Sequence, residues 1–207
     1  MTDAAHGARY LALGDSYTIG EGVQAADRWP VQLAHALRAQ GLALEDPQLI
    51  ATTGWTTDEL AAGIAEAAPQ GPFALVSLLI GVNNQYRGRP LDEYRVQFGQ
   101  LLEQAIGYAG GAAGHVLVLS IPDWGVTPFA TSQRRDAARI ADEIDRFNAV
   151  AREACQARGV AFIDITPVSR EHGADARMLV EDGLHPSAAM YAHWTARALP
   201  AARQALG

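Results

Sequence analysis

The chain has 207 residues, 49% of them hydrophobic and 19% charged, which is the composition of one folded domain and excludes a disordered, collagen-like or coiled-coil protein. Its 16 basic and 23 acidic residues give a formal net charge of −7, and because no basic stripe is visible we expect no nucleic-acid partner and no binding to an anionic membrane surface. The single cysteine, Cys155, excludes an internal disulfide.

Short apolar runs alternate with longer helical patterns along the whole chain. In the first half they predict a strand at 9–13, a helix at 31–39 after Pro30, a weak strand at 49–51, a helix at 58–68 capped by Thr56 or Thr57, and a strong strand at 73–80. In the second half they predict a helix at 91–109, a strand at 116–121, a helix at 132–158, a strand at 160–165 and a helix at 187–199, which Pro200 is expected to end or kink.

Strand runs of this kind are apolar on both faces, which is typical of a parallel sheet covered by helices on each side. We therefore predict a doubly wound α/β protein, a three-layer α/β/α sandwich with a central sheet of about five strands. Because no repeat or linker divides the chain, residues 1–207 are expected to form a single domain. Ligands of such sheets bind at the carboxyl ends of the strands, so the residues that follow each strand are the candidates for chemistry.

Four short motifs occupy these positions. They are GDSYTIGEG at 14–22 after the first strand, TGWTT at 53–57 after the second, GVNN at 81–84 after the third, and DGLHP at 182–186 near the carboxyl terminus. Each motif alone is common, but the set in this order resembles the SGNH hydrolases, also called GDSL-type esterases and lipases. The resemblance extends from about residue 11 to residue 186.

This resemblance implies a flavodoxin-like parallel sheet and a serine esterase that needs no cofactor and no metal. It implies that Ser16 is the nucleophile, His185 the base and Asp182 the acid of an Asp-x-x-His pair. It also implies that Ser16, Gly54 and Asn83 donate hydrogen bonds to the oxyanion. A small-molecule ester is the partner expected for such an enzyme, and the sequence does not indicate an oligomeric state.

The residue types agree with that chemistry. A serine hydroxyl is a weak nucleophile until an imidazole takes its proton, and the imidazole needs a carboxylate to fix its tautomer. Asp182 and His185 are three residues apart, so one loop can supply both groups. The developing oxyanion needs about two or three preorganised donors, and loss of one typically costs about 10²–10³ in turnover.

Several assignments stay open at this stage. Asp123 and Asp164, which follow the fourth strand and end the fifth, are also placed where a triad acid can lie. Ser16 has an alternative interpretation as the N-cap of a helix that starts at the next residue. Asp15 is expected to hold its loop through backbone hydrogen bonds. Asn84 stands where the family usually has Asp, and an amide can accept many of the same hydrogen bonds.

Other classes of function fit the sequence less well. A nucleotide-binding module would use the loop after the first strand, but that loop lacks the P-loop lysine and the GxGxxG pattern and carries Asp15 and Glu21. The elbow motif of the α/β-hydrolase fold is absent because position 18 is Thr18. The six histidines have no metal-ligand spacing, and Cys155 lies on an apolar helical stripe, as a buried small hydrophobic residue would. A purely binding member of the family would be expected to lack the serine or the histidine.

Aromatic residues after the strands indicate where the substrate binds. We expect the substrate-binding residues to be Tyr17, Trp55, Tyr86, Trp124 and Phe129. The hypothesis is hydrolysis of short- to medium-chain carboxylic esters. Alternatives within the same family are carbohydrate O-deacetylation, lysophospholipase or thioesterase activity, and acyl transfer. The alternative from another class is a non-catalytic nucleotide- or ligand-binding module.

The sequence also bears on location. The longest apolar stretch, 74–82, is interrupted by Ser77 and Gly81 and is far short of the roughly 20 residues that span a bilayer. The first seven residues have neither the basic nor the apolar region of a signal peptide. We expect a cytoplasmic protein with no integral membrane association, and a chain trimmed of its signal peptide would have the same sequence.

Overall fold

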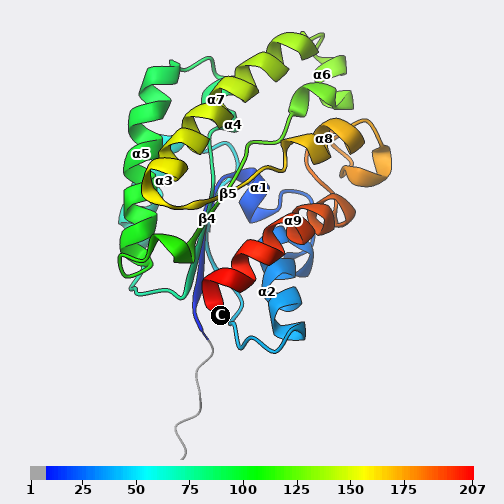
Figure 1. Ribbon diagram of the computed structural model, residues 1–207. Coiled ribbons are helices and arrows are strands. Elements are labelled where there is room, and N and C mark those ends of the chain that lie inside the picture. Colours follow the sequence, from blue (N-terminus) through cyan, green and yellow to red (C-terminus); the bar gives the residue numbers. More distant parts are fainter. Residues whose placement is uncertain (1–7) are drawn as a thin grey trace, which may run out of the picture.

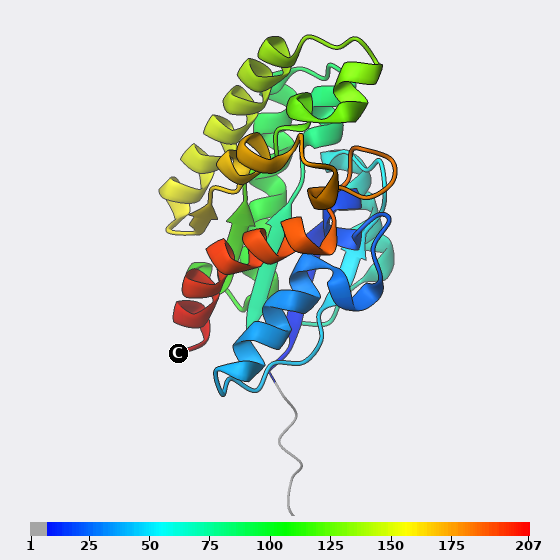
Figure 2. The ribbon, with the colours of Figure 1, turned by 90° about the vertical axis from the view of Figure 1, so that its right-hand side faces the viewer.

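Five strands form one parallel sheet with the order β2-β1-β3-β4-β5 (Figures 1 and 2). The strands are β1 (Tyr10–Gly14), β2 (Gln48–Ala51), β3 (Leu75–Leu79), β4 (Val116–Leu119) and β5 (Ala161–Ile163). The computed structural model describes residues 8–207, so residues 1–7, on which the expectation about a signal peptide rests, lie outside the described residues. The sheet order is the flavodoxin-like one, which confirms the predicted fold class.

The three inner strands are apolar on both faces because both faces are covered. Every residue of β1, β3 and β4 is buried, whereas the edge strands β2 and β5 are partly exposed. The strands predicted at 73–80, 116–121 and 160–165 all extend past the observed ends, where side chains form hydrogen bonds with the backbone groups. The carbonyl of Ile80 accepts a hydrogen bond from Tyr94 (3.2 Å), and the amide of Ile121 donates to Asn148 Oδ1 (2.8 Å), so both residues lie beyond the ends of their strands.

Helices cover the two faces of the sheet, with α3, α5 and α7 on one side and α2 and α9 on the other (Figure 1). The α-helices are α1 (Ser16–Ile19), α2 (Trp29–Ala39), α3 (Thr57–Ala67), α4 (Val82–Tyr86), α5 (Leu91–Tyr108), α6 (Pro128–Ser132), α7 (Ala137–Arg158), α8 (Thr166–His172) and α9 (Ala188–Leu206). Short 3-10 turns occur at Ala25–Asp27, Ala113–His115, Trp124–Val126 and Ala176–Met178. The three predicted layers are therefore present.

The starts of two helices depend on capping residues. The helix predicted at 132–158 starts only at Ala137, because the chain turns between α6 and α7 at Arg134, whose φ of 52° is left-handed. Asp136 then caps α7 by accepting hydrogen bonds from the amides of Ala138 and Arg139. Of the two threonines proposed to cap α3, Thr56 does so, within a capping box completed by Glu59.

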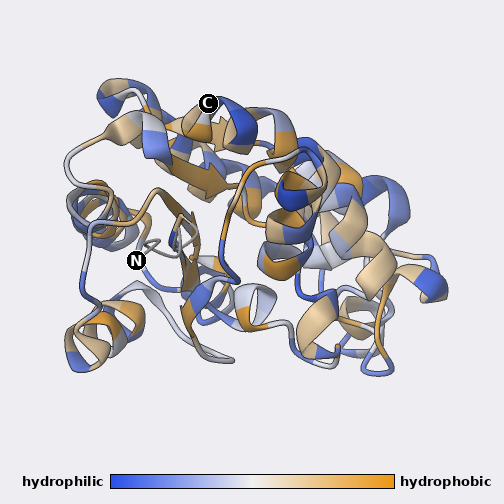
Figure 3. Ribbon diagram, turned by 90° about the horizontal axis from the view of Figure 1, so that it is seen from below, coloured by the Kyte–Doolittle hydropathy of each residue, from blue (hydrophilic) through white to orange (hydrophobic). Residues whose placement is uncertain are grey.

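Of the two outcomes predicted for Pro200, an end or a kink of the last helix, the end is wrong, because α9 continues to Leu206. Its buried stripe runs past the proline, with Trp194 and Ala198 before it and Ala202 and Ala205 after it. Burial of this stripe outweighs the loss of one helical hydrogen bond. Figure 3 shows the same distribution of hydrophobic residues in the whole molecule: the central strands are orange (hydrophobic), and the helix ribbons alternate between orange and blue. Within residues 8–207 no helix is both long and apolar enough to cross a membrane.

The chain leaves the sheet in a sharp turn between β1 and α1. A Cβ on Gly14 would lie 2.2 Å from Thr18 Oγ1 and 2.5 Å from the carbonyl oxygen of Leu79, so only glycine fits there. Ser16 consequently lies directly above the carboxyl end of β1. This strand is flanked by β2 and β3, so the loops after all three strands meet at one edge of the sheet.

Candidate active site

Ser16 is the first residue of α1, and its hydroxyl is not used to cap that helix. The N-cap is Asp15, whose Oδ1 accepts a hydrogen bond from the amide of Tyr17 (3.0 Å). The interpretation of Ser16 as an N-cap is therefore wrong. The Ser16 side chain lines a cavity at the carboxyl ends of the strands, although only 4% of the residue surface is exposed. Asp15 has the backbone-bonding role that was expected for it.

Asp182 and His185 form a pair within one tight turn before α9. Nδ1 of His185 lies 2.6 Å from Oδ2 of Asp182, and Oδ1 of Asp182 accepts hydrogen bonds from the amides of Leu184 (2.8 Å) and His185 (2.9 Å). Desolvation by burial raises the pKa of Asp182, but the hydrogen bonds from His185 and from the two amides outweigh it and hold the pKa below its ordinary value. An ionised carboxylate only accepts, so Nδ1 carries the proton and Nε2 is left to accept one.

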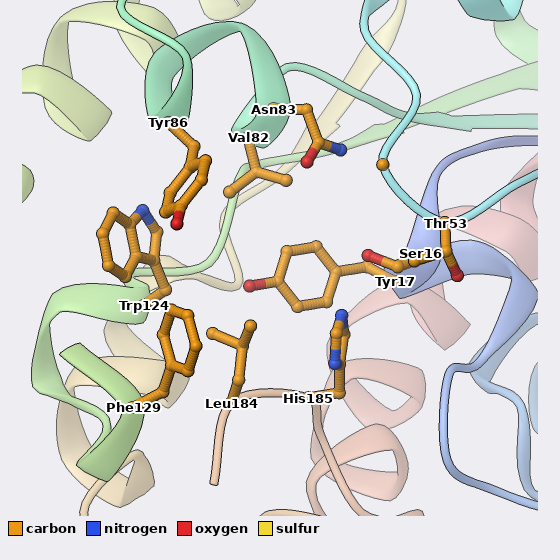
Figure 4. Close-up of a pocket in the computed structure, with 11 residues that line it drawn as sticks. Ser16, Tyr17, Thr53, Val82, Asn83, Tyr86, Trp124, Phe129, Leu184 and His185 are labelled. Atoms are coloured by element: carbon orange, nitrogen blue, oxygen red, sulfur yellow. The ribbon is translucent and has the colours of Figure 1, made fainter. Parts of the chain in front are cut away.

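Figure 4 shows Nε2 of His185 turned toward the Ser16 hydroxyl. The ring is also packed against Tyr17, with the two ring centroids 5.7 Å apart. The His185 side chain is 11% exposed and Asp182 42% exposed. The acid–base pair is thus open to solvent on the carboxylate side and enclosed on the side that faces the serine.

Gly54 and Asn83 lie across the cavity from His185. Gly54 has a φ of 88°, and its carbonyl accepts a hydrogen bond from Arg87 Nη2 (2.6 Å), which points the carbonyl away from the cavity. Nδ2 of Asn83, at the start of α4, donates to the carbonyl of Trp55 (2.9 Å). An amide nitrogen has two hydrogens, so one of them remains for another acceptor. Ser16, Gly54 and Asn83 all line the same cavity.

Asn84 anchors the loop after β3, as expected for the residue that replaces an aspartate. Its side chain is fully buried; Oδ1 accepts a hydrogen bond from the amide of Thr57 (3.1 Å) and Nδ2 donates to Thr57 Oγ1 (2.7 Å). These two bonds tie the start of α3 to the start of α4. The orientation of Asn83 is therefore fixed from its neighbour as well as from Trp55.

The two other carboxylates considered as triad acids are bound elsewhere. Asp123 is buried and forms an ion pair with Arg170 Nε (2.8 Å), while its Oδ1 accepts from the amide of Gly125 (2.9 Å). Asp164 pairs with Arg152 Nη2 (2.7 Å) and accepts a hydrogen bond from Ser120 Oγ (3.1 Å). Neither carboxylate lines the cavity that contains Ser16.

The cavity has a volume of about 210 Å³ and a mostly apolar wall. Figure 4 shows Ser16 and His185 at one end and an aromatic group at the other. This aromatic group consists of Tyr86, Trp124 and Phe129, with ring centroids 5.3 Å apart for Tyr86–Trp124 and 6.3 Å for Trp124–Phe129. Tyr17 also lines the cavity.

Trp55, which was expected to bind the substrate, does not line this cavity. Its ring covers α3, where a Cβ on Gly63 would lie 2.1 Å from the ring, and only its backbone carbonyl contributes, as the acceptor for Asn83. Three lining residues were not expected, namely Thr53, Val82 and Leu184. All three lie within the four motifs, so their place in a motif was the sequence signal that could have identified them.

Among residues 8–207 no group of three or more His, Cys, Asp or Glu side chains gathers as a metal site would require. Cys155 is buried in α7, and burial raises the pKa of its thiol to about 12. It is a core residue, as the sequence indicated.

Comparisons with known proteins agree with this fold. The model of the GDSL-like lipase/acylhydrolase family matches residues 12–193. The chain is similar in structure to TesA (TM-score 0.73, 20% identity, covering 96% of this chain and 99% of that one). It is also similar to an acetyl xylan esterase variant from Geobacillus stearothermophilus (TM-score 0.71, 20% identity, 95% and 94%) and to an extracellular lipase from Streptomyces rimosus (TM-score 0.69, 22% identity, 96% and 99%). No curated protein sequence gives a significant match.

Proposed function

The chain belongs to the GDSL-like lipase/acylhydrolase family and is a serine ester hydrolase, and we propose that it hydrolyses short- to medium-chain carboxylic esters through an acyl-enzyme on Ser16. The observation that carries this proposal is the Asp182–His185 pair, whose Nδ1–Oδ2 distance is 2.6 Å and whose Nε2 is turned toward Ser16 (Figure 4).

In the first half-reaction, Ser16 Oγ attacks the ester carbonyl while Nε2 of His185 takes the hydroxyl proton. The imidazolium is stabilised by Asp182, and it returns the proton to the departing alcohol. The amides of Ser16 and Gly54 and the second Nδ2 hydrogen of Asn83 supply donors to the oxyanion. In the second half-reaction, water gives a proton to Nε2 of His185 as it attacks the acyl-enzyme, and the imidazolium returns that proton to Ser16 Oγ as the carboxylic acid is released.

The size of the cavity supports the chain-length part of the proposal. Its volume of about 210 Å³ lies below the range of about 300–1,000 Å³ that is usual for ligand pockets. Its apolar wall suits an acyl chain, and the aromatic group of Tyr86, Trp124 and Phe129 lies at the end opposite Ser16 (Figure 4). A short acyl chain therefore fits between the nucleophile and these rings.

A second candidate is the removal of acetyl groups from a carbohydrate. It is favoured by Tyr86, which is 43% exposed at the rim of the cavity and offers an aromatic face to a sugar ring. A series of p-nitrophenyl esters from acetate to palmitate separates the two candidates. Activity confined to acetate favours the deacetylase, a maximum between butyrate and octanoate favours the esterase, and a maximum at palmitate contradicts both.

The experiment that tests the nucleophile is intact-mass measurement after exposure to a fluorophosphonate. Wild type should gain one adduct that maps to Ser16, and Ser16→Ala should gain none and should lose ester hydrolysis. Ser132→Ala, which removes an exposed serine outside the cavity, is the matched control and should behave as wild type. An adduct on Ser16→Ala would mean that the nucleophile is another residue.

A further inference from the structure

A second cavity, of about 460 Å³, adjoins the catalytic one and shares Tyr86 with it. It lies between α4 and the turn that joins α6 to α7 (Figure 1). We call it the arginine pocket, because five of the 16 basic residues of this acidic chain line it: Arg89, Arg134, Arg135, Arg139 and Arg146. Two carboxylates also line the pocket, those of Asp136 and Glu143.

Both carboxylates already have partners. Oδ1 of Asp136 accepts the amides at the start of α7, and Glu143 accepts from Arg139 Nε on one oxygen (2.8 Å) and from Gln85 Nε2 on the other (2.7 Å). Desolvation by burial raises the pKa of Glu143, but the hydrogen bonds from Arg139 and Gln85 and the nearby charges of Arg139 and Arg135 hold it below its ordinary value. Glu143 is therefore an anion that is already satisfied.

The arginines divide into paired and unpaired ones. Arg89 forms ion pairs with Asp58 and Glu93, Arg146 with Asp142, and Arg139 with Glu143. Arg134 and Arg135 form no ion pair with any carboxylate within residues 8–207. Both side chains line the arginine pocket, and the charge of Arg135 also acts on Glu143 without forming an ion pair with it.

Arg135 connects this pocket to the catalytic cavity. Its guanidinium carbon lies 5.2 Å from the ring centroid of Tyr86 and 5.3 Å from that of Trp124. These two rings form the end of the catalytic cavity opposite Ser16 (Figure 4). Cation–π contact orients the guanidinium, and the amide of Arg135 donates to the carbonyl of Ala130 (3.0 Å), so its backbone is fixed as well. Arg135 therefore lies beside two of the rings that form the end of the catalytic cavity, and Tyr86 is common to both cavities.

We propose that the arginine pocket is a subsite for an oxyanion, a carboxylate or a phosphate, carried at the far end of the acyl group. This inference rests on the proposed ester hydrolysis at Ser16. A guanidinium offers a planar fork of donors that matches the two oxygens of a carboxylate or a phosphate. Because neither Arg134 nor Arg135 forms an ion pair among residues 8–207, binding of the substrate anion by them breaks no existing ion pair.

The test compares three p-nitrophenyl esters with the same leaving group: hexanoate, the hydrogen adipate with a terminal carboxylate, and the methyl adipate, its uncharged analogue. Wild type should prefer the hydrogen adipate over the methyl adipate by about fivefold in kcat/KM at low ionic strength, the scale of one exposed ion pair. The preference should fall as salt is added. Equal kcat/KM values for the two adipates in wild type would overturn the inference.

The variants locate the preference. Arg135→Gln should bring the adipate ratio close to one, whereas Arg197→Gln, the same charge change on exposed α9, should keep the wild-type ratio. A ratio that survives in Arg135→Gln would place the charge preference elsewhere and contradict the proposal. Hydrolysis of hexanoate distinguishes failure of the proposed function from failure of the subsite. If neither wild type nor Ser16→Ala hydrolyses hexanoate, it is the proposed ester hydrolysis that has failed, and not the subsite.

Inhibition by small anions identifies the oxyanion. Acetate and inorganic phosphate are compared at matched ionic strength as inhibitors of hydrogen adipate hydrolysis. Stronger competition by phosphate assigns a phosphate ligand, and stronger competition by acetate a carboxylate. Equal effects of either anion on wild type and Arg135→Gln would count against the subsite.

Discussion

Replacement of Asp15 by asparagine should stabilise the folded protein in a strongly pH-dependent way. Asp15 is fully buried next to Ser16, and its Oδ2 has no hydrogen-bond partner among the described residues. Desolvation by burial raises its pKa to about 7, although the amides of Tyr17 and of Asp15 itself act to lower it. Asparagine retains an oxygen that can accept from the Tyr17 amide, and it never ionises.

The magnitude follows from the two pKa values. In the unfolded chain the carboxyl has a pKa of about 3.9, and each unit of difference is worth about 1.36 kcal/mol. With a folded pKa of about 7, the difference corresponds to a free energy on the order of 4 kcal/mol. The Asp15 carboxyl binds its proton more tightly in the folded state than in the unfolded chain. The contribution of this proton to the free energy of unfolding is therefore fully present below about pH 4, decreases as the pH rises, and is lost above about pH 7.

The assay is urea denaturation of wild type and Asp15→Asn at several pH values between 4.5 and 8.5. The other titrating groups cancel in the difference between the two proteins, so the difference should grow by up to about 1.36 kcal/mol per pH unit and become constant above about pH 7. Asp92→Asn removes an exposed carboxyl from α5 and is the control, with an almost constant difference. A constant difference for Asp15→Asn would mean that Asp15 keeps an ordinary pKa, and the reasoning from its burial would be refuted.

Three further outcomes are expected. Asp182→Asn should lower kcat by about 10²–10⁴ because the histidine tautomer is no longer held, while Asp164→Asn should stay within about threefold; steady-state kinetics decide, and a larger loss for Asp164→Asn would reassign the acid. Asn84→Ala should lower the free energy of unfolding by about 1–3 kcal/mol, since the buried amide of Thr57 loses its acceptor; an unchanged urea midpoint would show that the anchor is dispensable. Pro200→Ala should raise the free energy of unfolding by about 1–3 kcal/mol by restoring a hydrogen bond within α9, and a lower midpoint would indicate that the proline is favourable there.

The fold could be predicted from the sequence because the strands and the motifs that follow them both have distinctive residue patterns. Buried parallel strands are apolar on both faces, and runs such as 73–80 show this directly. The error at Pro200 has a different origin. A local rule about proline was applied to a helix whose buried stripe, from Trp194 to Ala205, is stabilised by packing that the local sequence does not reveal.

The candidate site was predictable where residue type implies chemistry. Ser16 and His185 line one cavity, and Asp182 is paired with His185, as the motifs indicated. The position of the Trp55 ring could not be predicted, because its direction depends on the space that Gly63 leaves on α3. The arginine pocket was not predicted, because Arg89 and Arg135 are far apart in sequence and line the same cavity only when α4 and α7 pack together.

The turn that holds Asp182 and His185 fixes two properties of the histidine ring independently. Its internal hydrogen bonds join the two side chains within four residues, so which ring nitrogen carries the proton is determined locally. The direction of the other nitrogen depends on where the whole turn lies against α1, through the contact of the His185 ring with Tyr17. Changes in the segment between α8 and α9 can therefore move the imidazole relative to Ser16 without breaking the bond between Asp182 and His185.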